Sequence, residues 1–252
     1  MTSNFVTYQW SHWLPVSPVV IPCNPVVCVV ANFPGEYQPS QFNNVIRPKF
    51  RNSNEYVQLL LDNFKSELGI YFIPASTFSG DPYGGLERFW KNSFLWLFIE
   101  LYENNHLWTL KPVEKPPIED GKGTPWETVI HSAKVRFNCE MANHGWTSMQ
   151  GRVVFWFRIL YGIESGFVRG EVVFKLYGQK CERCTSGAFE TPLWYPEEIA
   201  NAMWNLYSKV AEKFYGRPVD KVVRGLRGGK PRTPHKPELC QSCSDGLPCG
   251  KP

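Results

Sequence analysis

Apolar residues recur every three or four positions in three segments of this chain, the spacing that places side chains on one face of an α-helix. The segments cover residues 54–68, 86–104 and 197–215. The third has the clearest ends, because Pro196 suits the first turn of a helix and Gly216 suits its stop. Its apolar stripe is expected to pack on a sheet and consists of Ile199, Ala202, Met203, Leu206, Tyr207, Val210, Ala211 and Phe214.

The pattern changes from Val129 onward to the alternation and the β-branched and aromatic runs that indicate strands. Two such runs, 152–161 and 167–177, flank a loop bounded by glycines and therefore predict a hairpin. An earlier strand ends at Cys139, and the second run of the hairpin leads directly to Cys181. We predict an α+β fold, in which a small antiparallel sheet carries cysteine knuckles and a packed amphipathic helix.

The first 35 residues contain no Lys, Arg, Asp or Glu and are rich in Val, Pro and aromatic residues. Because proline disfavours regular helices and strands, this segment is expected to be flexible, with Cys23 and Cys28 as free thiols. A glycine-rich loop before residue 86 indicates a boundary. We divide the chain into a Pro/Val-rich, partly disordered extension with one helix, residues 1–85, and a cysteine-bearing domain, residues 86–252.

Six of the eight cysteines and two of the five histidines lie after residue 138. Zinc takes four nitrogen or sulfur ligands in a tetrahedron, and two C-x-x-C pairs present their thiolates at the right spacing. Eight donors suffice for two closed zinc sites, and a closed site leaves no coordination position for a substrate. The candidate ligands are Cys139, His144, Cys181, Cys184, His235, Cys240, Cys243 and Cys249.

Disulfides are the alternative use of these cysteines, and the start of the chain argues against them. It has neither the basic region nor the apolar run of a secretory signal, and a reducing compartment favours metal ligation. No segment predicts a transmembrane helix, because prolines interrupt the most apolar stretch, Val16 to Phe33. We expect a cytoplasmic protein, or one held at the periphery of the endoplasmic reticulum or plasma membrane.

Positive charge is concentrated near the C-terminus. Residues 217–252 hold eight Lys or Arg and three Asp or Glu, whereas the whole chain has a net charge of +4. Its basic, irregular part, residues 217–236, is either a solvated linker between the zinc sites or a contact for RNA phosphates. In the second interpretation, Trp146 or Trp156 would stack on bases, and the phosphate contacts would be Arg224, Arg227, Lys230, Arg232 and Lys236.

Catalytic motifs do not emerge from the sequence. A zinc deaminase needs H-x-E and then P-C-x-x-C, but Ser-Ala follows His131 and Gly-Trp follows His144. No G-x-S-x-G or P-loop motif occurs. We therefore expect a binding protein with no catalytic residues and no small-molecule substrate.

From about Leu86 to its end, the chain resembles the receptor-transporting protein family, which is built on the 3CxxC-type zinc finger. The likeness covers roughly two-thirds of the chain, and it depends on an ordered set of motifs because one C-x-x-C alone is weak. Those motifs are Phe94-Leu-Trp-Leu-Phe-Ile-Glu, Trp108-Thr-Leu-Lys, Val135-Arg-Phe-Asn-Cys139, Tyr177-Gly-Gln-Lys-Cys-Glu-Arg-Cys184, Lys213-Phe-Tyr-Gly216 and His235-Lys-Pro-Glu-Leu-Cys240-Gln-Ser-Cys243, with Cys249 closing the last.

The chain departs from the family in its first knuckle, where the second cysteine would fall at Ala142. His144 lies two residues later and is expected to substitute for it; the alternative is a degraded first site with His144 in a surface loop. We group Cys139 with the Cys181 pair, although interleaved sites are an alternative. Several members also carry a C-terminal membrane anchor, which we do not expect here because no apolar segment ends this sequence.

The resemblance implies a zinc-binding, chaperone-like adaptor that binds membrane receptors and assists their delivery to the cell surface. Its aromatic hairpin and N-terminal region would present a peptide-binding surface. The zygote arrest group, which shares the zinc-finger plan and binds RNA, is a more distant likeness. It implies the alternative function of an RNA-binding zinc finger in translational control.

Overall fold

A mixed five-stranded sheet forms the centre of the structure, a computed structural model that describes residues 50, 52–63, 80–99, 101, 106–164, 167–219 and 234–249. The strand order is β1-β4-β3-β2-β7, and β5 and β6 form a separate two-stranded sheet. The strands are β1 (His106–Pro112), β2 (Glu127–Cys139), β3 (His144–Glu164), β4 (Phe167–Tyr177), β5 (Gln179–Lys180), β6 (Phe189–Glu190) and β7 (Leu193–Trp194).

The predicted α+β class is confirmed, and the predicted hairpin is β3 and β4. The sheet is not wholly antiparallel, however, because β1 runs parallel to β4 along its outer edge. The sequence indicates only a short extended piece at Trp108. A parallel partner depends on contacts far along the chain, which local pattern does not report.

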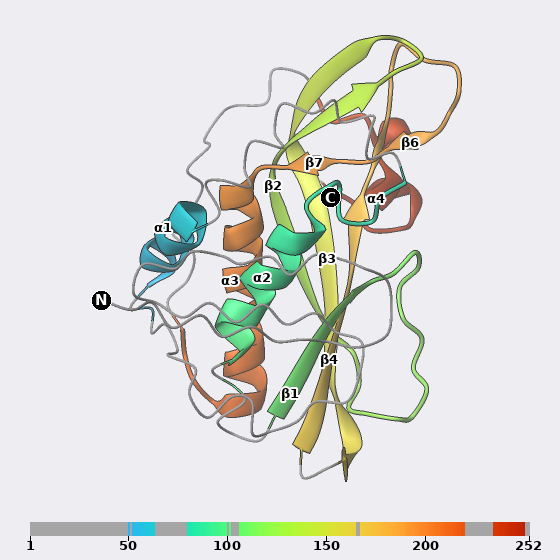
Figure 1. Ribbon diagram of the computed structural model, residues 1–252. Helices are drawn as coiled ribbons and strands as arrows, with labels where there is room; N and C mark the ends of the chain where they lie inside the picture. Colours follow the sequence, from blue (N-terminus) through green and yellow to red (C-terminus); the bar gives the residue numbers. More distant parts are fainter. Residues whose placement is uncertain are drawn as a thin grey trace, which may run out of the picture. The chain divides into compact units, whose positions relative to one another are not determined.

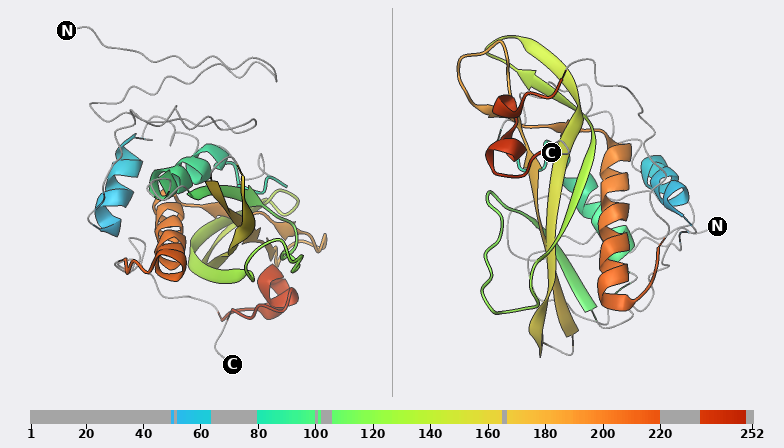
Figure 2. Two further views of the ribbon diagram at one scale, coloured as in Figure 1. Left: turned by 90° about the horizontal axis from the view of Figure 1, so that it is seen from below. Right: turned by 180° about the vertical axis from the view of Figure 1, so that it is seen from behind.

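Helices cover one face of this sheet, as Figures 1 and 2 show for α2 and α3. Their spacing of apolar residues produces the expected amphipathic faces. The C-terminal part of the chain adds two short helical turns beside the strands. The helices are α1 (Ser53–Asn63), α2 (Glu87–Phe98), α3 (Pro196–Tyr215), the 3-10 turn η5 (Pro237–Leu239) and α4 (Gln241–Ser244).

Helix α3 matches its predicted range closely. Pro196 is in its first turn, and Gly216 ends it in the left-handed conformation with φ 60°. Helix α2 is shorter than predicted, and the remainder of the range predicted for α1 lies outside the described residues, as do Cys23 and Cys28. Tyr56 of α1 packs on Trp204 of α3, so this helix contacts the main fold, and the boundary at residue 85 stays a prediction.

The main core lies between the helices and the sheet. Trp90 of α2 stacks on Phe174 and meets Trp194 edge to face, and Phe155 closes the cluster. On the opposite face, Trp156 and its neighbours form a second buried cluster consisting of Val154, Trp156, Val173 and Tyr177, against which Val113, Trp126 and Leu247 pack.

The burial of Trp156 contradicts the prediction that this residue stacks on bases. Trp156 is 7% exposed and is therefore unavailable for stacking on bases. Three further aromatic residues of the hairpin are core residues, because Phe155 and Phe174 are fully buried and Phe157 is 2% exposed, whereas Tyr161 is 67% exposed. The buried aromatic residues of the hairpin therefore contribute to the core, and a peptide-binding surface on the hairpin stays a prediction.

Candidate metal centre

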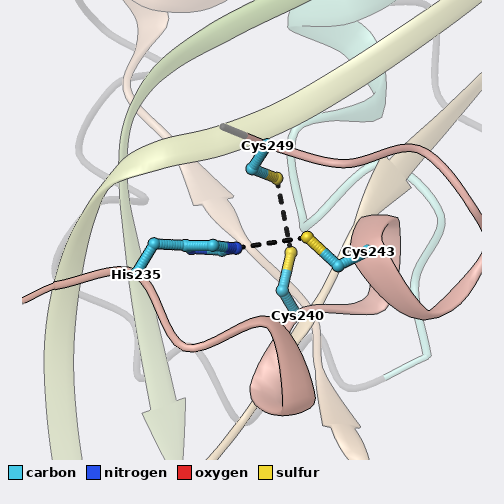
Figure 3. A group of neighbouring side chains, drawn as sticks. All are labelled: His235, Cys240, Cys243 and Cys249. Atoms are coloured by element: carbon cyan, nitrogen blue, oxygen red, sulfur yellow. Dashed lines mark hydrogen bonds between the residues drawn. The ribbon is translucent and has the colours of Figure 1, made fainter. Parts of the chain in front are cut away.

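Four nitrogen and sulfur donors converge near the C-terminus, and we name them the C-terminal cluster: His235, Cys240, Cys243 and Cys249. Their ligand atoms all lie within 4.8 Å of one another. His235 Nε2 is 3.2 Å from Cys243 Sγ, and Cys240 Sγ is 3.5 Å from Cys249 Sγ (Figure 3). The turn η5 and the helix α4 place these side chains, because Cys240 ends the first and begins the second.

The geometry of the cluster fits a zinc ion. Two sulfur ligands at the usual Zn–S distance from a tetrahedral centre are separated by about 3.8 Å. The Cys240–Cys249 separation of 3.5 Å is close to that value and far from a disulfide bond, whose sulfurs are about 2 Å apart. The six described cysteines are free. One imidazole and three thiols are a donor set that zinc commonly takes.

The electrostatics of the cluster prepare one thiol for metal binding. The hydrogen bond between the Cys240 and Cys249 thiols, together with the backbone amides of Cys243 and Ser242, lowers the pKa of Cys240. The same contact raises the pKa of Cys249. Zinc binding would release the remaining thiol protons of the cluster.

The second group of predicted ligands, the hairpin cluster, lies where β2 turns into β3. We define it as Cys139, His144, Cys181 and Cys184. Cys139 ends β2 and pairs in register with His144, the first residue of β3. Cys181 Sγ is 3.6 Å from His144 Nδ1. Burial raises the pKa of Cys139 to about 12, with smaller effects from Glu190, Cys181 and Cys184, so its thiol is buried close to these three side chains.

Cys184 has polar contacts of its own within the hairpin cluster. Its Sγ lies 3.1 Å from Ser186 Oγ and accepts a hydrogen bond from the Ser186 amide at 3.3 Å. It also lies 3.9 Å from the sulfur of Met141, whose side chain is 76% exposed. The structure thus places Cys139 opposite His144 and Cys181 beside it. The assignment of all four residues as zinc ligands stays a prediction.

Direct contacts join the two clusters. Gln179 forms an isolated β-bridge with Cys240, and the Gln241 side chain accepts a hydrogen bond of 2.8 Å from the Gly178 amide. Lys236 forms an ion pair with Glu182, the residue that follows Cys181. The chain segments that lead into Cys181 and Cys240 therefore run side by side.

Of the five predicted phosphate contacts, the structure describes Lys236. The other four, Arg224, Arg227, Lys230 and Arg232, lie outside the described residues. Lys236 is exposed, but its ammonium is paired with Glu182. Trp146 is half-buried and stacks between Phe137 and His144. Within the described residues, the side chains predicted to contact RNA are therefore engaged in contacts within the chain, and RNA binding stays a prediction.

We predict that His144→Ala lowers the zinc content of the purified chain by one ion if His144 is the fourth ligand of the hairpin cluster. Three thiolates alone leave the tetrahedron incomplete. Mass spectrometry under native conditions measures the stoichiometry directly. Glu140→Ala, a change to the exposed residue that follows Cys139, is the control. An unchanged zinc content in His144→Ala would remove His144 from the ligand set.

Comparison with known proteins agrees with the motifs. Residues 132–246 match a family model of the 3CxxC zinc-ribbon type, described as a zinc-binding domain. Receptor-transporting protein 4 of Mus musculus is 26% identical over 140 residues, which are 54% of this chain and 54% of the relative. The same protein of Homo sapiens is 24% identical over 172 residues, 64% of each chain. The predicted resemblance is therefore confirmed.

The alignments leave part of each relative unmatched. Receptor-transporting protein 1 of Macaca fascicularis is 24% identical over 128 residues, 50% of this chain and 47% of the relative. The chain thus spans about half to two-thirds of the length of these curated relatives. No solved structure matches. Within the described ranges, no helix has the length and apolar character needed to cross a membrane.

Proposed function

We propose that this chain is a zinc-binding adaptor that binds membrane receptor proteins and assists their delivery to the cell surface in a chaperone-like manner. The observation that carries the proposal is the C-terminal cluster, in which four protein donors converge and leave no position for a substrate. The similarity to proteins named receptor-transporting supports the choice of partner. The proposed adaptor acts in the cytoplasm, at the periphery of the endoplasmic reticulum or the plasma membrane.

Zinc has a structural role in this proposal. His235, Cys240, Cys243 and Cys249 hold one ion, and Cys139, His144, Cys181 and Cys184 hold a second. A bound zinc ion supplies folding energy to a segment with little core of its own. The segments that carry the two clusters are joined by the Gly178–Gln241 hydrogen bond and the Lys236–Glu182 ion pair. Together with the two zinc ions, these contacts would hold one end of the domain, residues 86–252, rigid.

We expect coexpression of the full chain to raise the surface level of its receptors in cultured cells. The receptors carry an extracellular epitope tag, and flow cytometry of intact cells measures the exposed tag against total receptor. Cys243→Ser removes a proposed ligand and is expected to abolish the increase. Ser244→Ala changes the next residue, which is exposed, and should retain it.

Native purification from the same cells identifies the partner. Receptors that copurify with the wild-type chain and are absent with Cys243→Ser support the adaptor. A panel of receptors with neither copurification nor increased surface level contradicts it. Ultraviolet crosslinking of RNA runs in parallel, and an RNase-sensitive signal that Cys240→Ser abolishes would instead favour the RNA-binding alternative.

A further inference from the structure

A buried arginine of the sheet reaches into the C-terminal cluster. Arg152 lies on β3 and is 7% exposed. Its Nη1 group lies 2.9 Å from Ser242 Oγ, 2.7 Å from the Leu247 carbonyl and 3.1 Å from the Pro248 carbonyl. Ser242 is the residue before the ligand Cys243, and Pro248 is the residue before Cys249.

These contacts fix the loop that closes the cluster. The Ser242 hydroxyl also donates to the Leu247 carbonyl at 2.6 Å, and the Leu247 amide donates to the Ser242 carbonyl at 2.8 Å. Arg152 therefore binds both sides of the loop that separates α4 from Cys249. Since the sheet holds the guanidinium, the separation of the Cys243 and Cys249 thiols is tied to the sheet as well.

The charge of Arg152 has no carboxylate partner in the part of the chain that the structure describes, and its Nε has no hydrogen-bond acceptor there. Burying an unpaired charge is costly, so a compensating negative charge is expected nearby. Arg158, six residues along the same strand, shows the ordinary solution. It is 4% exposed and is paired with both Asp120 and Glu171.

The C-terminal cluster supplies such a negative charge when it holds zinc. Three thiolates and a neutral imidazole around a divalent ion carry a net charge of −1, because the three negative charges exceed the two positive ones. The guanidinium carries +1. The loaded cluster and Arg152 are thus complementary in charge, just as Arg158 is complementary to its carboxylates.

We propose that Arg152 is the positioning residue and the counter-charge of a zinc centre formed by the C-terminal cluster. This inference rests on the proposed zinc site. Residues that hydrogen-bond around a metal site orient its ligands, and their loss commonly weakens metal binding roughly 10–100-fold. Arg152 acts in this way through the Ser242 hydroxyl and the Leu247 and Pro248 carbonyls, and it contributes no ligand itself.

The test measures zinc release from the zinc-loaded full chain into a chromophoric chelator. The kinetic phase that Cys249→Ser abolishes belongs to the C-terminal cluster. We expect Arg152→Gln to weaken zinc binding in that phase by roughly 10–100-fold and to leave the other phase unchanged. We also expect zinc release to begin at a higher pH, since thiolates without the counter-charge are protonated more easily.

Two further variants separate charge from general stability. Arg152→Lys keeps the positive charge but can form fewer hydrogen bonds to the loop, so its rate of zinc release should lie between those of the wild type and Arg152→Gln. Arg158→Gln removes the other buried arginine of β3 and should release zinc at the wild-type rate even where its thermal stability is lower. If Arg152→Gln fails to fold, Arg152→Lys is compared with Arg158→Lys by the same measurement.

Each outcome decides the inference. Wild-type release from the Arg152 variants, or equally fast release from the Arg158 variants, overturns it while the zinc site itself stands. A wild-type chain with no phase that Cys249→Ser abolishes overturns the zinc site and the role of Arg152 together.

Discussion

Removing zinc with a chelator at neutral pH is expected to unfold the segment 234–249, which carries the C-terminal cluster. Within this segment only Cys240 and Ser242 are buried, so it has almost no apolar core of its own. Leu247 is its one hydrophobic contact with the buried cluster on the sheet. Structural zinc contributes apparent binding energies of about 10–16 kcal/mol in small zinc-finger peptides, far more than one partly buried leucine can supply.

Hydrogen exchange followed by mass spectrometry measures this effect segment by segment. Peptides covering 240–249 should lose protection in chelator, whereas peptides from α3 should keep theirs because that helix packs in a separate aromatic core. Cys243→Ser should behave like the chelator-treated chain, and Ser244→Ala should behave like the wild type. Equal protection of 240–249 with and without zinc would show that hydrogen bonds alone hold the segment.

Helix α3 illustrates what local sequence determines well. Its apolar period, the proline of its first turn and the glycine after its last turn are all short-range signals, and the structure has the helix at Pro196–Tyr215. Strand β1 is the contrasting case. Its residues read as extended, but its parallel pairing with β4 depends on an edge that folds from residues some sixty positions later.

The turn between β2 and β3 explains why His144 rather than Ala142 faces Cys139. Asn143 adopts a left-handed conformation with φ 41°, and its amide donates to the Glu140 carbonyl at 2.9 Å. This turn pairs His144 with Cys139 across the strands. The sequence offers His144 only as the nearest nitrogen donor, since the position of a residue across a hairpin depends on turn geometry.

The two buried arginines of β3 show where sequence reasoning stops. Arg152 begins an apolar run and Arg158 interrupts it. A weak signal exists, because Arg152 alternates in phase with Val154 and Trp156 on one face of the sheet. The sequence around each arginine does not tell that Arg158 pairs with two carboxylates whereas Arg152 lies beside a cluster of thiols. That difference depends on which distant loop covers each end of the strand.

Replacing Trp90 by alanine is expected to destabilise the fold by about 3–5 kcal/mol, the usual cost of removing a large aromatic side chain from a core. Trp90 is fully buried. Its ring centroid lies 5.4 Å from that of Phe174 and 5.8 Å from that of Trp194. Because these partners come from β4 and β7, the cavity would separate α2 from both the centre and the edge of the sheet.

Urea unfolding of the zinc-loaded chain, followed by tryptophan fluorescence, measures the change in the free energy of unfolding. Lys91→Ala is the matched control on the same helix, since Lys91 is exposed and its ion pair with Glu87 contributes only about 0.3–0.5 kcal/mol.

Trp90→Phe keeps most of the ring volume and removes an indole nitrogen that has no hydrogen-bond partner in the described structure, so it should be much milder than alanine. An alanine variant no less stable than the Lys91 control would place the main core elsewhere. Zinc content should stay at the wild-type value in the folded Trp90 variants, because the described ring contacts of Trp90 are with Phe155, Phe174 and Trp194 and not with either cluster. Loss of zinc there would mean that core packing and metal binding form one cooperative unit.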